Sequence, residues 1–146
     1  MGIDVGTTGT RAVIVRPDGH VVGAATGEHQ PMRMEKPSWA EQDPEDWWQA
    51  TQVAVRAALA EAGVKGPDIA AVGLSGQMHG VVLFDKNHAV LRPSLIWCDQ
   101  RSQAQCDWIT SQVGAEKLIE LVSNPALTGF SAPKLLWVRD NEPKIY

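Results

Sequence analysis

The sequence predicts an α/β fold built on a mixed sheet whose first three strands are antiparallel. Three observations support this prediction. The first third of the chain holds short runs of β-branched residues separated by tight-turn signals. An amphipathic segment of helical length follows, and a nearly continuous apolar run of strand length comes after it. A helix between an antiparallel meander and a buried strand is typical of α/β proteins.

The three antiparallel strands are predicted before residue 30. The runs GIDV (2–5) and TRAVIV (10–15) are joined by a Gly/Thr turn, and the turn signal RPDGH leads into VVGAATGEH (21–29). Short connections of this kind join neighbouring antiparallel strands. The stretch MRMEKPSWAEQ (32–42) that follows is predicted to be irregular.

The longest helix is predicted to begin after Asp43 and to end at Gly63. Asp43 is a good N-cap, Pro44 suits the first helical position, and the next two residues are acidic, which favours the positive end of the helix dipole. The apolar positions recur at spacings of three and four residues, so one face is expected to pack on the sheet. They are Trp47, Trp48, Thr51, Ala54, Val55, Ala58 and Leu59.

The run IAAVGLSG (69–76) has the pattern of an interior strand covered on both faces. GVVLFD (80–85) and AVLR (89–92), separated by KNH, resemble a hairpin. The remaining pattern predicts helices at about 101–112, 115–123 and 133–141. We find no internal repeat, linker or domain boundary.

Charge and cysteine content exclude several classes of protein. The net charge of −4, without any basic run, disfavours a nucleic acid or an anionic membrane as the main partner. The two cysteines, Cys98 and Cys106, form neither a CxxC motif nor a disulfide framework. No apolar run approaches the roughly twenty residues that span a bilayer. We therefore expect a cytoplasmic location.

The Gly/Thr turn after Asp4 has two readings from its residues alone. It lacks the Walker A and GxGxxG patterns, and a strand follows it, so no helix dipole is available. Converging backbone N–H groups and threonine hydroxyls can still bind phosphate, as in anion-binding nests. Asp4 beside a phosphate then implies Mg²⁺, held through water. The other reading is a plain hairpin turn that Asp4 caps.

Five blocks of the sequence resemble the N-terminal domain of the FGGY carbohydrate kinases. They are DVGTTGTRAVIV, WAEQDPEDWW, GLSGQMHGVVLFD, LIWCDQR and NPALTGFSAPKLLWV, in collinear order over nearly the whole chain. The resemblance implies an actin-like ATPase fold built on a ribonuclease H-like motif. Within the family, the QMHG stretch is most similar to the members that act on D-xylulose.

The resemblance implies that the γ-phosphoryl group of ATP is transferred to D-xylulose, giving D-xylulose 5-phosphate, with Mg²⁺ as the metal. Asp4 then lies by the metal and the phosphates. The turn residues that contact the ATP phosphates are Gly6, Thr7, Thr8, Gly9 and Thr10. Arg11 follows them and could add positive charge, although a solvated strand position is the preferred interpretation.

The sugar side of the implied site maps onto two segments. Gln77, Met78 and His79 come just after the apolar strand, where ligands bind in open α/β sheets. Trp97, Asp99 and Arg101 are a second candidate wall, although Asp99 and Arg101 are nearly as well explained as a structural pair that opens the next helix. Closure of the sugar cleft is assigned to Thr128 or Lys134, and His20, His29 and His88 are interpreted as surface residues.

The resemblance also implies that residues 1–146 are a partial N-terminal domain. Family members run to several hundred residues, and their catalytic aspartate lies in a Gly-rich segment that has no counterpart here, so no general base is assigned. We expect this chain alone to be inactive, to bind ATP weakly or not at all, and to form a homodimer or aggregate through exposed apolar surface. The alternatives are another FGGY kinase (glycerol, gluconate or ribulose), a ribonuclease H-like nuclease, and a non-enzymatic actin-like nucleotide-binding module.

Overall fold

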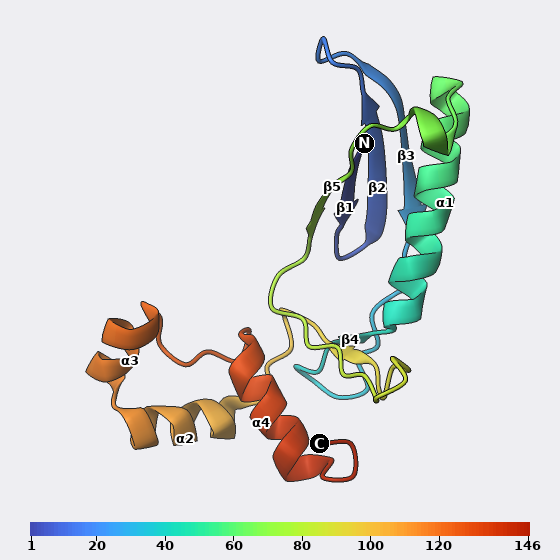
Figure 1. The fold of residues 1–146 in the computed structure, drawn as a ribbon. Coiled ribbons are helices and arrows are strands. Elements are labelled where there is room, and N and C mark those ends of the chain that lie inside the picture. Colours follow the sequence, from blue (N-terminus) through green and yellow to red (C-terminus); the bar gives the residue numbers. More distant parts are fainter. The chain divides into compact units, whose positions relative to one another are not determined.

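The structure, a computed structural model, describes residues 1–146, which form two compact units (Figure 1). The first unit comprises Met1–Pro31 and Asp43–Gln77, and the second comprises Met32–Gln42 and Met78–Tyr146. The chain passes between the units three times, and no shift in composition marks these positions. This is why the sequence patterns do not indicate the division.

The first unit contains a four-stranded mixed sheet. Its strands are β1 (Gly2–Val5), β2 (Gly9–Val15), β3 (Val21–Glu28) and β5 (Gly73–Gly76), in the order β3-β2-β1-β5. The first three strands pair antiparallel, and β5 pairs parallel to β1. The predicted fold class is therefore confirmed, including the parallel strand after the helix.

The helix of this unit, α1 (Pro44–Ala62), packs along β2 and β3 (Figure 1). Both predicted caps are confirmed: the Asp43 carboxylate accepts from the Glu45 N–H at 3.0 Å, and Gly63 is left-handed with φ +65°. The buried positions of the helix are the small residues Ala50, Ala54 and Ala58. The prediction for Trp48 is wrong, because its side chain is 59% exposed.

The small side chains on α1 follow from how closely the helix approaches β3. A Cβ added at Gly23 would collide with the carbonyl oxygen of Ala58, and one added at Gly27 with that of Ala50. The backbones therefore touch at these two glycines, and a tryptophan has no room on this face. The core between sheet and helix consists of Ala12, Ile14, Ala54 and Ala58.

The prediction of an interior strand over 69–76 is wrong in length and in burial. A short 3₁₀ turn (Gly66–Asp68) precedes this region, β5 covers only its last four residues, and all four are exposed. Leu74 is 78% exposed. This region is exposed because β5 is an edge strand with one partner, β1. Helix α1 packs mainly on β2 and β3, toward the opposite edge of the sheet.

The second unit combines a small ladder with three helices. Strands β4 (Glu41–Gln42) and β6 (Ser94–Leu95) pair antiparallel, and the helices are α2 (Gln103–Val113), α3 (Ala115–Val122) and α4 (Ser131–Asn141). The three predicted helices are confirmed with ends shifted by up to two residues. The predicted hairpin is reduced to one bridge, Phe84 to Val90. The β4–β6 ladder was not predicted, since two-residue strands carry no periodicity.

None of the helices combines the length and the apolar character needed to cross a membrane.

Candidate functional site

The sheet places Asp4 beside two other polar side chains. Asp4 on β1 lies in register with Arg11 on β2 and with Ser75 on β5. Paired residues share a face of a sheet, and this face is opposite α1, because the intervening residues of β2, such as Ala12, are buried against the helix. Asp4 and Arg11 are exposed. These residues line a shallow hollow of about 330 Å³ on the open face of the sheet.

The turn that follows Asp4 is not a nest of alternating right- and left-handed residues. The N–H of Gly6 donates to the carbonyl oxygen of Gly9 at 3.0 Å, which closes the turn. None of the residues from 6 to 10 has a positive φ. Gly9 is required for another reason: a Cβ there would lie 2.8 Å from the carbonyl oxygen of Gly27.

Thr10 is buried, whereas a threonine that binds phosphate through its hydroxyl is expected to be accessible. Its side chain is fully buried on the α1 side of β2. Its hydroxyl lies 2.9 Å from Nε2 of His29 and 3.4 Å from the hydroxyl of Thr51 on α1. Of the three threonines in the turn, Thr8 is exposed and Thr7 is half-buried, so these two remain the candidate hydroxyl ligands.

The prediction that His29 is a surface residue is wrong. Only 9% of its surface is exposed, and the ring packs behind the turn, where it contacts Thr10 and Thr7. The alternation of side chains along β3 accounts for this position once the structure shows which face meets α1. Side chains alternate along a strand, so the residues of β3 that face α1, Gly23 and Gly27, place His29 on the same side.

The predicted sugar-binding segment runs from the first unit into the second. Gln77 ends the first unit, where its N–H donates to the carbonyl oxygen of Val5 at 2.8 Å. Met78 and His79 belong to the second unit, and Met78 is 64% exposed. His79 has a left-handed backbone, φ +62°, and its exposed ring meets the ring of Phe130 edge-on, with centroids 4.7 Å apart.

Lys134 holds the backbone of His79. The lysine is fully buried, and its ammonium group donates to the carbonyl oxygens of His79 at 2.9 Å and of Gly129 at 2.5 Å. Burial lowers the pKa of Lys134 below its usual range, and the nearby Asp99 carboxylate opposes that shift. Because a non-glycine residue rarely adopts a positive φ, this bond helps to fix His79 in an uncommon conformation.

Asp99 and Arg101 form a buried structural pair in the second unit. Asp99 is fully buried; its carboxylate accepts from the Ala40 N–H at 2.7 Å and from Nε of Arg101 at 2.9 Å. The Arg101 side chain is 1% exposed, and its guanidinium lies over the rings of Trp39 (3.8 Å) and Trp137 (4.9 Å). The structural explanation therefore accounts for both residues.

The pair belongs to a larger network of buried charges. Glu41 accepts from Arg101 at 2.7 Å and from Arg92 at 2.6 Å, and Arg92 lies 2.8 Å from Glu142. Buried charges are tolerated when each has partners of opposite sign, as here. Sequence reasoning missed the network because its members come from distant segments.

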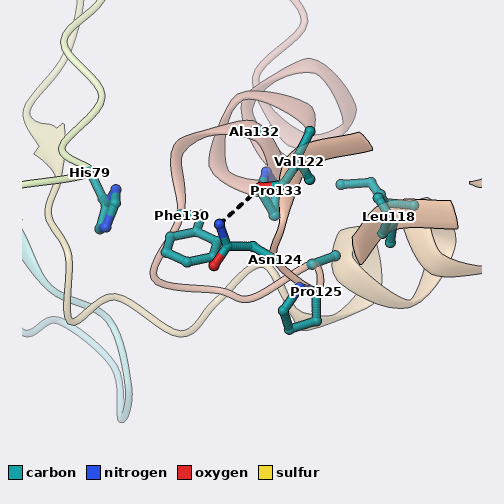
Figure 2. Close-up of a pocket in the computed structure, with 10 residues that line it drawn as sticks. His79, Leu118, Val122, Asn124, Pro125, Phe130, Ala132 and Pro133 are labelled. Carbon is teal, nitrogen blue, oxygen red and sulfur yellow. Dashed lines mark hydrogen bonds between the residues drawn. The ribbon is translucent and has the colours of Figure 1, made fainter. Parts of the chain in front are cut away.

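A cavity of about 360 Å³ lies beside His79 in the second unit (Figure 2). Its lining is mostly apolar and comes from α2, α3, α4 and the segment between α3 and α4. It includes Ile109, Leu118, Val122, Pro125, Phe130 and Pro133. Asn124 is tied to the Val122 carbonyl oxygen at 3.0 Å. Such a wall suits apolar groups better than hydroxyls. Trp97, 47% exposed, remains the accessible residue of the second predicted wall, and Thr128 is half-buried.

Comparison with solved structures shows which class of protein has this fold and turn. The crystal structure of a xyloylose kinase from Brucella ovis superposes with a TM-score of 0.91 at 38% identity, covering 99% of this chain and 30% of that chain. The class is that of the actin-like ATPase fold as it occurs in sugar kinases.

Sequence comparison identifies the family. The FGGY family of carbohydrate kinases, N-terminal domain, matches residues 1–146. The xylulose kinase of Escherichia coli (strain K12) is 40% identical over 146 residues, 100% of this chain and 29% of that protein. The glycerol kinase of Leifsonia xyli subsp. xyli (strain CTCB07) is 34% identical over 142 residues, 97% of this chain and 28% of that protein. The chain belongs to the FGGY family of carbohydrate kinases, as its motifs predict, and spans less than a third of these relatives.

Proposed function

We propose that residues 1–146 serve a kinase that transfers the γ-phosphoryl group of ATP to D-xylulose, giving D-xylulose 5-phosphate. The observation that carries this proposal is the match of the whole chain to xylulose kinases, at up to 40% identity. The family supports a carbohydrate kinase. The glycerol kinase, at 34% identity, lies within the 32–40% range of the xylulose kinases, so the choice of sugar rests on the QMHG segment, 77–80.

The phosphate side of the proposed site is the open face of the first unit. Asp4 is exposed there, next to Arg11, and the turn from Gly6 to Gly9 follows directly. No group of three or more His, Cys, Asp or Glu side chains forms a metal cage. A single exposed carboxylate fits Mg²⁺, which keeps several waters and is bound mainly by substrate phosphates. When bound, Mg²⁺ neutralises charge on the phosphates.

The residues of this chain bind and orient ATP in the proposed mechanism. Backbone N–H groups of the turn and the hydroxyls of Thr7 and Thr8 donate to phosphate oxygens, and Asp4 holds the metal through water. The Arg11 guanidinium, which donates to the Thr26 hydroxyl at 3.3 Å, adds positive charge on the same face. Phosphoryl transfer depends chiefly on such positioning and charge stabilisation.

The sugar side is assigned to Gln77, Met78, His79 and Trp97. The imidazole of His79 can donate to or accept from a hydroxyl, Met78 packs against carbon atoms, and Trp97 offers an apolar plane to the C–H face of a sugar. Asp99 and Arg101 are left out of the sugar side, because their network of buried charges accounts for them as structural residues.

The remaining parts of the proposed enzyme lie outside these residues. We propose that 1–146 form part of an N-terminal domain, that the general base comes from another part of the protein, and that these residues alone are inactive. Cytoplasmic location and homodimer formation stay predictions.

A substrate panel tests this function. In a coupled assay of the full-length protein that includes residues 1–146, we expect kcat/KM for D-xylulose to exceed that for glycerol, gluconate and D-ribulose by about 10²-fold. A preference for glycerol or gluconate would assign the chain to another FGGY activity. ATP binding without phosphorylation of any of these sugars would favour a non-enzymatic nucleotide-binding module.

A further inference from the structure

We propose that His29 is a positioning residue that sets the direction of the backbone N–H groups in the turn from Gly6 to Thr10. The inference rests on the proposed function of this turn as the phosphate-binding element. It assigns His29 no contact with ATP. The histidine acts through the turn, from the side that faces α1.

Three contacts join His29 to the turn. Its backbone N–H donates to the carbonyl oxygen of Thr8 at 3.0 Å. Its Nε2 lies 2.9 Å from the hydroxyl of Thr10, and its Nδ1 lies 3.4 Å from the carbonyl oxygen of Thr7. One residue thus holds three of the five turn residues, two through its ring and one through its backbone N–H.

The chemistry of these partners fixes the protons in the neutral ring. The Thr7 carbonyl only accepts, so Nδ1 carries the ring proton and Nε2 accepts. The hydroxyl of Thr10 therefore donates to Nε2. The hydroxyl of Thr51 lies closer to the Trp47 carbonyl oxygen, at 2.7 Å, than to Thr10, so its proton goes to Trp47. Each donor and acceptor in this series of hydrogen bonds then has a partner of the required kind.

Planarity of the peptide bond carries the effect to the other side of the turn. In a trans peptide, the C=O of one residue and the N–H of the next point in opposite directions. Because His29 draws the carbonyl groups of Thr7 and Thr8 toward itself, the N–H groups of Thr8 and Gly9 point away from it. Without a left-handed residue in the turn, these bonds replace the backbone alternation by which a nest aims its donors.

Burial makes the histidine hard to replace by water. His29 is 9% exposed and Thr10 is fully buried, so loss of the ring leaves the Thr10 hydroxyl without its acceptor. The carbonyl group of Thr7 then loses its hydrogen bond to the ring and its peptide is free to rotate, whereas Thr8 keeps its bond to the backbone N–H of residue 29. Phosphate donors that are no longer pre-oriented bind more weakly.

The test compares nucleotide and sugar binding in variants of the full-length protein. His29→Leu removes both ring contacts, and we expect it to raise the Kd for a non-hydrolysable ATP analogue and the KM for ATP about tenfold, with the KM for D-xylulose unchanged. His29→Gln offers a side-chain acceptor to Thr10, and we expect it to recover most of the loss. His20→Leu is the matched control, because the His20 side chain is 73% exposed, and we expect no change.

A folded His29→Leu protein with unchanged affinity for the analogue would overturn the inference. If that variant does not fold, Thr10→Val removes the donated hydroxyl at nearly constant volume; the same rise in Kd is expected, and no rise would overturn the inference. A wild-type protein that binds no ATP analogue would overturn both this inference and the proposed function. A wild-type protein that binds the analogue but prefers another sugar would overturn the proposed substrate alone, because the Kd comparison still tests His29.

Discussion

The ammonium group of Lys134 lies 2.9 Å from the carbonyl oxygen of His79 and ties the candidate sugar ligand to α4. Lys134→Met keeps the length of the side chain but removes the donor, so the carbonyl groups of His79 and Gly129 lose their partner. We expect a loss of about 1–3 kcal/mol in the free energy of unfolding. We also expect the KM for D-xylulose to rise about tenfold in the full-length protein, because His79 is no longer held at positive φ.

Lys117→Met is the control for this prediction, since the Lys117 side chain is 51% exposed and pairs only with Glu120. Thermal unfolding and steady-state kinetics with both substrates provide the measurement. An unchanged KM for the sugar in a folded Lys134→Met protein would show that the lysine serves stability alone.

Arg101 is expected to serve the fold and not to touch the sugar. Arg101→Lys loses the bidentate bonds to Asp99 and the planar stacking on Trp39, and we expect the protein to be destabilised by about 3 kcal/mol. The KM for D-xylulose should stay within about twofold at temperatures where the variant is folded, because Arg101 makes no contact with the sugar in this account. Arg16→Lys, at a side chain that is 55% exposed, is the control. A large rise in KM without loss of stability would restore the sugar-binding interpretation.

Gly27 is expected to be intolerant of any side chain. Gly27→Ala pushes a methyl group into the backbone of α1 at Ala50, and we expect a loss of about 1–3 kcal/mol or more in urea unfolding. Gly73→Ala is the matched control, because a Cβ there meets no atom within 4 Å. Equal effects of the two substitutions would contradict the close approach of α1 to β3.

The two thiols are expected to react slowly in the folded protein. Burial raises the pKa of both Cys98 and Cys106 above the ordinary value of 9.0. The thiolate is the reactive form, so at a given pH below the folded-state pKa less of each thiol is ionised than in the unfolded chain. Alkylation by iodoacetamide at pH 8 should be slower in native than in urea-unfolded protein for both residues. Equal rates would show that the thiols are not shielded.

Much of the fold was predictable because its signals are local. The caps of α1, Asp43 and Gly63, fix its ends within one residue, and the Gly/Thr and Asp-Gly turns separate the first three strands correctly. The predictions that failed concern residues whose positions depend on partners distant in the sequence. Trp48 fits the helical period but faces solvent, because the contact with Gly23 and Gly27 selects alanines instead.

The site was predictable in its positions but not in all of its roles. The resemblance to the family located the turn and the QMH segment, yet no pattern distinguishes Thr8, which is exposed, from Thr10, which is buried. Asp99 and Arg101 are two residues apart in a typical pairing, and only their contacts with Ala40 and Glu41 reveal a structural role. His29 was missed because its partners are about twenty residues away in the sequence.

In the proposed enzyme, one set of residues binds ATP and another binds the sugar. The most direct test is to measure the steady-state kinetics of Asp4→Asn and His79→Leu in the full-length protein with both substrates varied. Asp4→Asn is predicted to lower kcat by about 10²-fold and to raise the Mg²⁺ requirement, with the KM for D-xylulose unchanged. His79→Leu is predicted to raise the KM for D-xylulose about tenfold, with the KM for ATP unchanged. A change of the sugar KM in Asp4→Asn, or of the ATP KM alone in His79→Leu, would contradict the assignment.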